Sequence, residues 1–338
     1  MKPRRLEVAV IGCGDIAVSQ HLPALGGDGR FDVVAVADAV RERAERAAAQ
    51  FSVPRVVDDV EQALALEPDA VVIATPPHVS PFIAGAALAA GAHVLCEKPI
   101  AVTLDAADEL VEQVEATDRI FQVGFKNRFS PLVQGLRRLV AEGRLGEPLL
   151  IRTGAFAEAY RPADELHTNR IRGFLDQGPP IVHEGAHAAD LLNWLLGPPT
   201  TVSATSHRSR PSFPAPNYHC AAIEYADGSL AKLEVGWWFP HMLAGELHVY
   251  GPGGAADLSR PAGYLRFHDG RELQEEQSDE DWQTVCFRGQ LDAFHEAIEG
   301  GPQRGADVAA GRDALRLTLA VVEAAERREP VHYQAQVR

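Results

Sequence analysis

The first third of the chain alternates short apolar runs with helical stretches. Helices are expected to begin at Asp15, Val40, Val79 and Thr103, each after a run rich in β-branched residues that predicts a strand. Apolar strands that alternate with helices are typical of a parallel sheet covered on both faces, so this part predicts a doubly wound α/β domain. The predicted strands are LEVAVI (6–11), FDVVAVA (31–37), AVVIA (70–74) and HVLC (93–96).

The pattern changes near GFKNRFSP (124–131). From about residue 149, polar-alternating runs such as CAAIEYA (220–226) and SLAKLEVGWWF (229–239) indicate an open, mainly antiparallel sheet with one face against helices. A chain of 338 residues exceeds the roughly 250 to 300 that one hydrophobic core serves, so we predict an α/β domain followed by an α+β domain. Closing helices are expected at roughly 289–299 and 307–327.

Composition narrows the class of protein. The chain is 46% apolar and 23% charged, as in ordinary globular proteins. Its net charge of -15, with lysine and arginine spread thinly, provides no basic stripe for a phosphate backbone, so no nucleic-acid partner is expected. Residues 70–96 carry no charged side chain, but Pro76, Pro77 and Pro81 interrupt them, so no membrane span is expected.

The cysteines bear on the cellular compartment. They lie far apart and form no C-x-x-C pair, which favours a reducing compartment over a disulfide framework or a zinc ribbon. We therefore expect a cytoplasmic protein. The four cysteines are Cys13, Cys96, Cys220 and Cys286.

The first predicted strand leads directly into GCGDIA, in which a helix begins. Gly12 permits the tight turn, Gly14 lets the backbone approach a pyrophosphate, and Ala17 allows close packing of the helix. Asp38 ends the second strand, where a carboxylate accepts hydrogen bonds from both ribose hydroxyls. The motif predicts a dinucleotide-binding Rossmann domain over residues 1–126; a glycine turn that binds nothing is the alternative.

Asp38 also bears on the choice between NAD and NADP. A 2′-phosphate about 4 Å from this carboxylate would meet a repulsion of roughly 1 to 4 kcal/mol. Arg41 and Arg43, which begin the next helix, are the groups that could receive such a phosphate. We expect NAD as the cofactor, with NADP less favoured.

The segment CEKPI (96–100) directly follows the last strand of the predicted parallel sheet. Residues just beyond the carboxyl ends of such strands face the ligand crevice, so Lys98 is placed to meet a bound cofactor or substrate. A solvated loop lysine is the alternative.

Several segments together resemble the glucose-fructose oxidoreductase and inositol dehydrogenase family, Gfo/Idh/MocA. The resemblance covers essentially the whole chain, and the Glu-Lys-Pro motif is its most specific part. Beside GCGDIA and Asp38, the segments that carry it are ATPPHVS (74–80), GAHVLCEKP (91–99), GFKNRFSP (124–131) and GAHAADLLNWLLG (185–197).

The resemblance implies an activity and an assembly. The activity is NAD(P)-dependent oxidation of a sugar, sugar derivative or cyclitol hydroxyl, or the reverse reduction. The second domain, over 127–338, would bind the substrate and form the subunit interface with its open sheet. We therefore expect a homodimer or homotetramer, in keeping with the apolar alternation that includes Trp237 and Trp238.

The resemblance also implies roles for individual residues. Lys98 would lie beside the nicotinamide and the substrate, and His187 would be the general acid/base that takes the hydroxyl proton. The implied cofactor-binding residues are Gly12, Gly14, Asp15, Ile16, Asp38, Thr75, Pro76, His78, Glu97 and Lys98. The candidate substrate-binding residues are Lys98, Arg128, Tyr160, Arg172, His183 and His187, of which Arg128, Tyr160 and Arg172 could as easily be surface or packing residues.

The stretch VHEGAHAAD (182–190) contains the H-E-x-x-H pattern of zinc metalloproteases as His183-Glu184-Gly185-Ala186-His187. The glycine and two prolines before His183 disfavour a long helix through both histidines, and the metzincin continuation fails at Asp190 and Asn193. In the family that the chain resembles, an aspartate commonly stands four residues before the catalytic histidine. We expect His183 to occupy that place without a metal, either as a catalytic group or as a structural histidine.

Two functions of other classes are left open. A non-catalytic NAD-binding regulator of the same fold would be expected to lose Lys98 or His187, and both are present. A zinc-dependent hydrolase that uses His183, Glu184 and His187 is less favoured. Asp190 would either orient the ring of His187 or be a solvated helix acid, and Ser80 stands where many relatives have a histidine.

Overall fold

The computed structural model describes residues 4–158, 172–173, 175–176, 178–239, 246–259, 263–278 and 280–333. Its contacts divide the chain into two compact units, residues 1–129 with 283–312 and residues 130–282 with 313–338. The sequence placed the first boundary within three residues of this division but assigned 283–312 to the second domain. This segment belongs with the first unit because Leu291 and Phe294 pack into the same core as Leu22 and Leu25.

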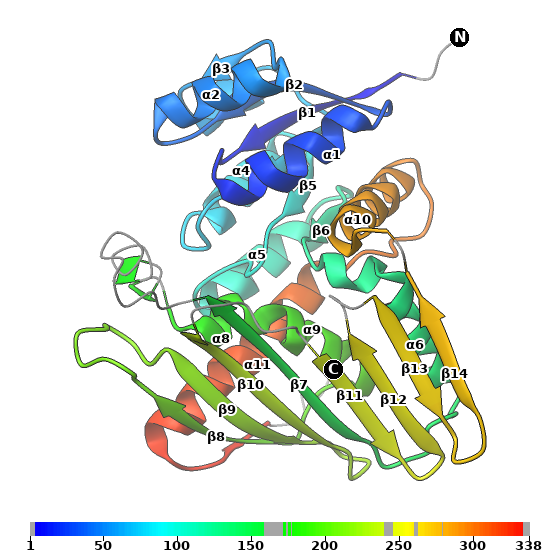
Figure 1. The fold of residues 1–338 in the computed structure, drawn as a ribbon. Helices are drawn as coiled ribbons and strands as arrows, with labels where there is room; N and C mark the ends of the chain where they lie inside the picture. The colour runs from blue at the N-terminus through cyan, green and yellow to red at the C-terminus, as the bar shows by residue number, and fades with distance from the viewer. Residues whose placement is uncertain are drawn as a thin grey trace. The chain divides into compact units, whose positions relative to one another are not determined.

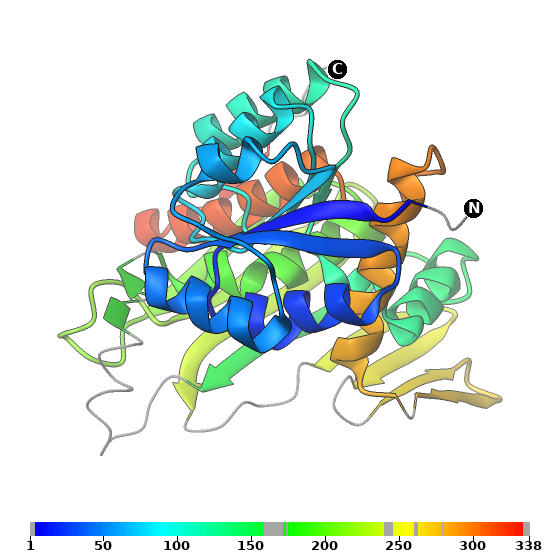
Figure 2. The same cartoon turned by 90° about the horizontal axis from the view of Figure 1, so that it is seen from above.

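The first unit is built on a six-stranded sheet in the order β3-β2-β1-β4-β5-β6. Every neighbouring pair in it is parallel, and helices lie on both of its faces (Figures 1 and 2). Its strands are β1 (Leu6–Ile11), β2 (Phe31–Ala37), β3 (Val56–Val57), β4 (Ala70–Ile73), β5 (His93–Cys96) and β6 (Phe121–Val123). Its helices are η1 (Ala17–His21), α1 (Leu22–Gly27), α2 (Arg41–Phe51), α3 (Val60–Leu64), α4 (Ser80–Ala89), α5 (Leu104–Glu115), η2 (Lys126–Phe129) and α10 (Trp282–Ile298).

The strands of this sheet end in register at one edge. Ile11 of β1 is paired with Ala37 of β2 and with Ile73 of β4, which in turn is paired with Cys96 of β5. The central residues of β1, β4 and β5 are almost fully buried, as strands covered on both faces must be. The residues that follow these four strands therefore meet along the edge at which ligands bind in folds of this type.

The second unit is built on a nine-stranded sheet in the order β14-β13-β12-β11-β7-β10-β9-β8-β15. Its neighbouring pairs are antiparallel except for β7 with β10. Its strands are β7 (Leu150–Glu158), β8 (Thr201–His207), β9 (Tyr218–Glu224), β10 (Leu230–Phe239), β11 (Glu246–Gly251), β12 (Gly254–Ser259), β13 (Tyr264–His268), β14 (Leu273–Gln277) and β15 (Val331–His332).

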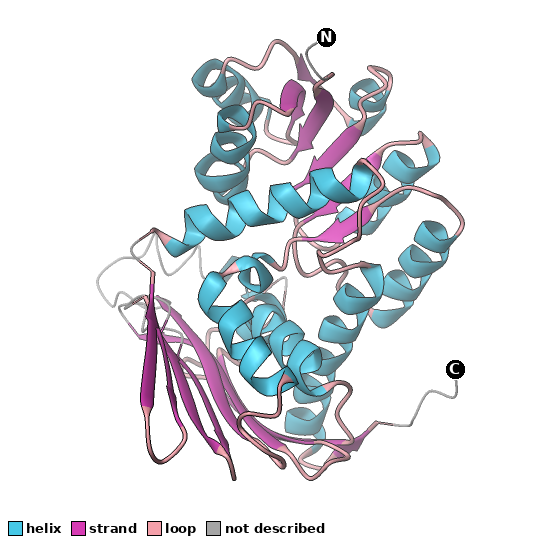
Figure 3. Ribbon diagram, turned by 90° about the vertical axis from the view of Figure 1, so that its right-hand side faces the viewer, coloured by secondary structure: helices cyan, strands magenta, loops and turns pink. Residues whose placement is uncertain are grey.

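Helices cover one face of this second sheet (Figure 3). They are α6 (Pro131–Ala141), α8 (Pro180–His183), α9 (Gly185–Leu196) and α11 (Val308–Arg327). The opposite face carries no helix of this unit among the described residues, so the predicted open, mainly antiparallel sheet and the α/β fold class are both confirmed. None of the helices in the described ranges has both the length and the apolar character needed to cross a membrane.

Candidate functional site

The glycine turn after β1 has the shape of a dinucleotide cradle. Gly12 has a φ of +94°, and a Cβ added to it would lie 2.5 Å from the carbonyl oxygen of Ala74, so only glycine fits there. A Cβ added to Gly14 would meet nothing within 4 Å, which leaves open space where a pyrophosphate would approach. Asp15 is exposed and Ile16 half-buried at the start of the helix that follows. The turn therefore fits a dinucleotide.

Asp38 lies beside this turn and is held by backbone donors. One carboxylate oxygen accepts a hydrogen bond from the N–H of Cys13 and the other from the N–H of Val40, each at 2.8 Å. Arg41, a possible receiver of a 2′-phosphate, forms ion pairs with Glu45 at 2.9 Å and with Asp58. A carboxylate at the strand end and an arginine already paired with two acids both disfavour a 2′-phosphate.

The loop after β4 reaches the same edge of the sheet. The hydroxyl of Thr75 lies 3.0 Å from the hydroxyl of Ser80, which is fully buried at the start of α4 and also lies 3.1 Å from the carbonyl oxygen of Pro76. Pro76 and His78 are exposed. Ser80, which stands where many relatives have a histidine, therefore fixes the loop that carries the predicted cofactor residues.

Glu97 and Lys98 follow β5 at this edge. The side chain of Glu97 accepts a hydrogen bond from the N–H of Lys98 at 3.2 Å, and its other oxygen lies 2.8 Å from Nε2 of His21. Burial raises the pKa of Glu97, but the hydrogen bond from His21 and the positive charges of His21, Lys98 and Lys126 outweigh it and hold that pKa below its usual range. The structure thus places an ionised carboxylate directly beside Lys98.

Sequence reasoning identified neither His21 nor Lys126. Nζ of Lys126 lies 4.7 Å from the centre of the Phe287 ring, and the ring of His21 meets the same phenyl ring edge-on at 5.1 Å. Both residues lie in the first unit, as does Arg128, which is buried in η2. The available signals were a histidine in the helix expected from Asp15 and a lysine in GFKNRFSP.

The two histidines of the H-E-x-x-H pattern lie in the second unit. His183 ends α8 and His187 is in the first turn of α9, with Glu184 between the two helices. The ring of His183 stacks on the ring of Trp237, with 6.2 Å between centres and 15° between planes. A Cβ on Gly185 would lie 2.8 Å from Ile181, so the glycine allows α9 to start close against α8. As predicted, no single long helix contains both histidines.

The remaining candidates of the second unit differ in their surroundings. Asp190, one turn after His187, is 1% exposed, so the alternative of a solvated helix acid is wrong. Arg172 is exposed and donates a hydrogen bond to the carbonyl oxygen of Ser212 at 3.2 Å. Tyr160 lies outside the described residues. The structure therefore gathers the predicted cofactor residues and Lys98 in the first unit and both candidate histidines in the second.

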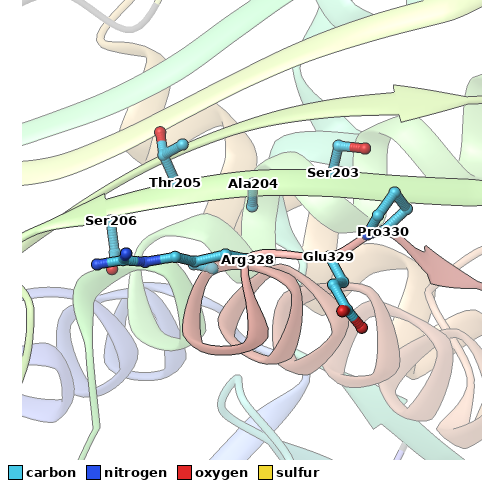
Figure 4. Close-up of a pocket in the computed structure, with 8 residues that line it drawn as sticks. Ser203, Ala204, Thr205, Ser206, Arg328, Glu329 and Pro330 are labelled. Atoms are coloured by element: carbon cyan, nitrogen blue, oxygen red, sulfur yellow. The ribbon is translucent and has the colours of Figure 1, made fainter.

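Two further features of the described residues bear on alternative sites. No group of three or more histidine, cysteine, aspartate or glutamate side chains is arranged to hold a metal ion in the described part of the chain. A cavity of about 530 Å³ lies beside β8 and the end of α11 and contains none of the predicted site residues (Figure 4). It is lined by Ser203, Ala204, Thr205, Ser206, Ala325, Arg328, Glu329 and Pro330.

Family models match both parts of the chain. A model described as an oxidoreductase family with an NAD-binding Rossmann fold matches residues 6–125, and a model of the Gfo/Idh/MocA C-terminal domain matches residues 133–257. The first match confirms the predicted NAD-binding domain. Together the two matches confirm the resemblance drawn from the motifs.

Similar proteins include named dehydrogenases. Inositol 2-dehydrogenase 2 of Saccharopolyspora erythraea is 30% identical over 89% of this chain and 87% of its own length. D-glucoside 3-dehydrogenase of Escherichia coli is 31% identical over 60% of this chain, and the match spans only 57% of that protein. The solved structure of a levoglucosan dehydrogenase in complex with NADH and levoglucosan superimposes with a TM-score of 0.86 over 98% of this chain and all of that one. Its sequence identity is 21%, so the likeness supports the fold alone.

Proposed function

Because this chain belongs to the Gfo/Idh/MocA family of NAD-binding oxidoreductases, we propose that it transfers a hydride between NAD and a hydroxyl-bearing carbon of a sugar, sugar derivative or cyclitol. The observation that carries the proposal is the edge of the parallel sheet, where the open glycine turn, Asp38 and the Glu97–Lys98 pair lie at the ends of β1, β2 and β5. Relatives named for inositol and glucoside oxidation support the substrate class.

The first unit would hold the cofactor. Gly12 and Gly14 leave space for the pyrophosphate against the start of the helix, and Asp38 would accept the ribose hydroxyls. Thr75 follows β4, which is paired with β1, and lies on the loop that Ser80 fixes. Bound at this edge, NAD would supply the acceptor for a hydride. NAD would be preferred over NADP because Asp38 repels a 2′-phosphate.

Three side chains would serve the proton transfer and the charge that accompanies it. His187 would take the proton from the substrate hydroxyl, since imidazole is suited to acid/base work at neutral pH. Lys98 would stabilise the negative charge that develops on the oxygen, and Glu97 keeps the charge next to it balanced. His183, held flat against Trp237, would accept a hydrogen bond from the substrate in the place of the family's usual aspartate.

An absorbance assay tests this function. The full-length protein is incubated with NAD and a panel of cyclitols, aldoses and glycosides, and formation of reduced nicotinamide is followed with and without a chelator. We expect reduction with at least one member and no effect of the chelator. Stoichiometric zinc in a purified protein that reduces no NAD would favour the zinc hydrolase, and NAD binding without any turnover would favour the regulator.

The histidines are separated by variants in the same assay. His187→Ala should lower turnover by about 10² to 10⁴-fold if it is the acid/base. His183→Asn should keep NAD affinity and lower turnover less, while His183→Asp should retain substantial activity. A His183→Asp variant that binds NAD normally but is inactive would contradict the proposed place of this residue.

We also propose that the chain assembles through the open face of its second sheet. Leu150 of β7 is directly paired with Leu230 of β10 and with Tyr250 of β11, so the three side chains form one row across adjacent strands. All three are exposed, Leu150 by 52%. A contiguous exposed apolar row on a face without helices supports a homodimer or homotetramer through this sheet.

A cytoplasmic location is proposed on the state of the cysteines. None of the four, all of which lie in the described ranges, forms a disulfide, and Cys13, Cys96 and Cys286 are buried. Burial raises the pKa of the Cys13 thiol to about 12, with a further contribution from the negative charge of Asp38. Buried thiols of this kind are inert and suit a reducing compartment.

A further inference from the structure

The helix that follows the glycine turn contains a π-helical turn, η1, directly after Asp15 and Ile16. The N–H of Leu22 donates to the carbonyl oxygen of Ala17, five residues earlier, rather than to the residue four earlier as in an α-helix. His21 and Leu22, although adjacent, are both buried, at 1% and 0% exposed. Irregular turns of this kind are frequent at functional sites, and this one directs an imidazole into the interior.

The buried imidazole reaches a residue next to Lys98. Nε2 of His21 lies 2.8 Å from Oε1 of Glu97, and because an ionised carboxylate only accepts, the imidazole is the donor. Two other groups confine the pair. The ring of His21 packs edge-on against Phe287, and a Cβ added to Gly124 would lie 3.0 Å from Oε1 of Glu97. The carboxylate therefore has little freedom to move.

In the described part of the chain, basic groups act on Glu97 from three elements: His21 on η1, Lys98 in its own loop and Lys126 on η2. The thiol of Cys96 also lies close, and its pKa is raised by burial and by the charge of Glu97. A carboxylate that is nearly buried stays ionised only while its hydrogen-bond donors remain, so removal of His21 would leave it uncompensated.

We propose that His21 is a positioning residue for Lys98, acting through the carboxylate of Glu97. This role rests on the proposed function, since it takes Lys98 as the group that stabilises charge on the substrate oxygen. With His21 in place, Glu97 remains ionised, accepts the backbone N–H of Lys98 and interacts electrostatically with its ammonium group. Without it, the carboxylate takes up a proton or turns away, and Lys98 loses its fixed counter-charge.

The composition of the chain allows a direct test. The sequence contains only four lysines, Lys2, Lys98, Lys126 and Lys232. Reductive methylation with ¹³C-formaldehyde therefore gives a handful of resolved dimethyl-lysine signals in the full-length protein, and Lys98→Arg assigns the one of interest. The signals of Lys98 and Lys126 report the ionisation of Glu97 as the pH is varied, whereas Lys232, paired with Glu234 in the second unit, serves as an internal reference.

The central variant is His21→Leu, with His21→Gln as the conservative replacement that keeps an N–H donor. The chemical shifts of the Lys98 and Lys126 signals should show an inflection at acidic pH, where Glu97 takes up its proton. In His21→Leu this inflection should move to higher pH, because burial raises the pKa of Glu97 and the hydrogen bond that opposes this effect is lost. His21→Gln should restore much of the original profile. Turnover of the best panel substrate should fall on the order of ten- to a hundredfold in His21→Leu, with NAD affinity little changed.

Two further variants serve as controls. His93→Leu removes a partly buried histidine that accepts the N–H of Ile120 at the start of β5, the end of the strand opposite to Glu97. This variant should leave both lysine profiles unchanged. Gly124→Ala crowds the Glu97 carboxylate directly and should shift the profiles in the same direction as His21→Leu, even if the latter fails to fold.

The possible outcomes distinguish a failure of the positioning role from a failure of the proposed function. Identical lysine profiles in wild type, His21→Leu and Gly124→Ala would overturn the positioning role, whatever the turnover. The variants could instead shift the lysine profiles while the wild-type protein fails to reduce NAD with any compound of the panel. In that case the proposed function is wrong, and the positioning role, which rests on it, is wrong as well. Shifted profiles with reduced turnover and rescue by His21→Gln would support both.

Discussion

The replacement Asp38→Asn should change the cofactor preference of this protein. The two carboxylate oxygens of Asp38 accept one backbone hydrogen bond each, from Cys13 and from Val40, so asparagine keeps the shape and one of the two acceptors but loses the charge. The lost backbone hydrogen bond weakens the glycine turn for NAD and NADP alike and cancels in the ratio of their affinities. That ratio therefore reports the removal of the charge, together with the weaker acceptor that is left for the ribose 2′-hydroxyl of NAD.

The size of the effect follows from Coulomb's law. A 2′-phosphate about 4 Å from the carboxylate is repelled by roughly 1 to 4 kcal/mol, depending on the local dielectric constant. Removal of the charge should therefore shift the NADP-to-NAD affinity ratio on the order of tenfold to several hundredfold towards NADP. Arg41 does not reverse this preference in the native protein because Glu45 and Asp58 already pair with it.

The assay is a fluorescence titration of each cofactor against wild type and variant at fixed ionic strength. Asp69→Asn is the matched control, because Asp69 also accepts a backbone N–H, from Glu7 at 2.8 Å, but precedes β4 at the opposite edge of the sheet. The control should leave the ratio unchanged. An unchanged ratio in Asp38→Asn as well would show that this carboxylate does not face the adenosine ribose.

Three further predictions test the packing and the assembly. Gly12→Ala should abolish NAD binding and lower the melting temperature, because its Cβ would lie 2.5 Å from the carbonyl oxygen of Ala74 at a φ of +94°; normal binding would contradict the fit of the turn. His219 is buried and its pKa is lowered to about 4 by desolvation, so the stability it confers is complete above about pH 6.5 and is lost as the pH falls towards 4. Urea unfolding should show a loss of about 3 kcal/mol over this range that His219→Gln removes, and equal slopes in both proteins would refute it. Leu150→Lys with Leu230→Lys should convert the assembly to monomers in light scattering, and an unchanged mass would place the interface elsewhere.

The sequence was most informative where local patterns determine structure. The β-branched runs, the glycine turn and Asp38 lie where they were predicted, because parallel strands and dinucleotide turns leave signatures within a few residues. It was less informative where distant segments meet. The packing of residues 283–312 on the first unit and the contact of His21 with Glu97 depend on tertiary contacts that no local periodicity encodes.

The Asp190 alternatives show the same limit. From the sequence, Asp190 could either orient the ring of His187 or be a solvated helix acid, because both roles fit a carboxylate one helical turn after the histidine. Only the packing of α9 against its sheet shows that Asp190 is buried. The H-E-x-x-H match shows the reverse case. The five-residue pattern is typical of a zinc-binding helix. The Gly-Pro-Pro segment before it led instead to the expectation of an interrupted helix, which the structure shows.

The most direct test of the central claim follows the transferred atom. The protein is incubated with NAD and substrate candidates deuterated at every carbinol carbon, beginning with myo-inositol and glucose, and the reduced cofactor is analysed by mass spectrometry. Hydride transfer from a substrate carbon predicts a reduced cofactor that carries one deuterium from the substrate. A reduced cofactor without deuterium, or no reduced cofactor across the panel from a protein that binds NAD, would contradict the account.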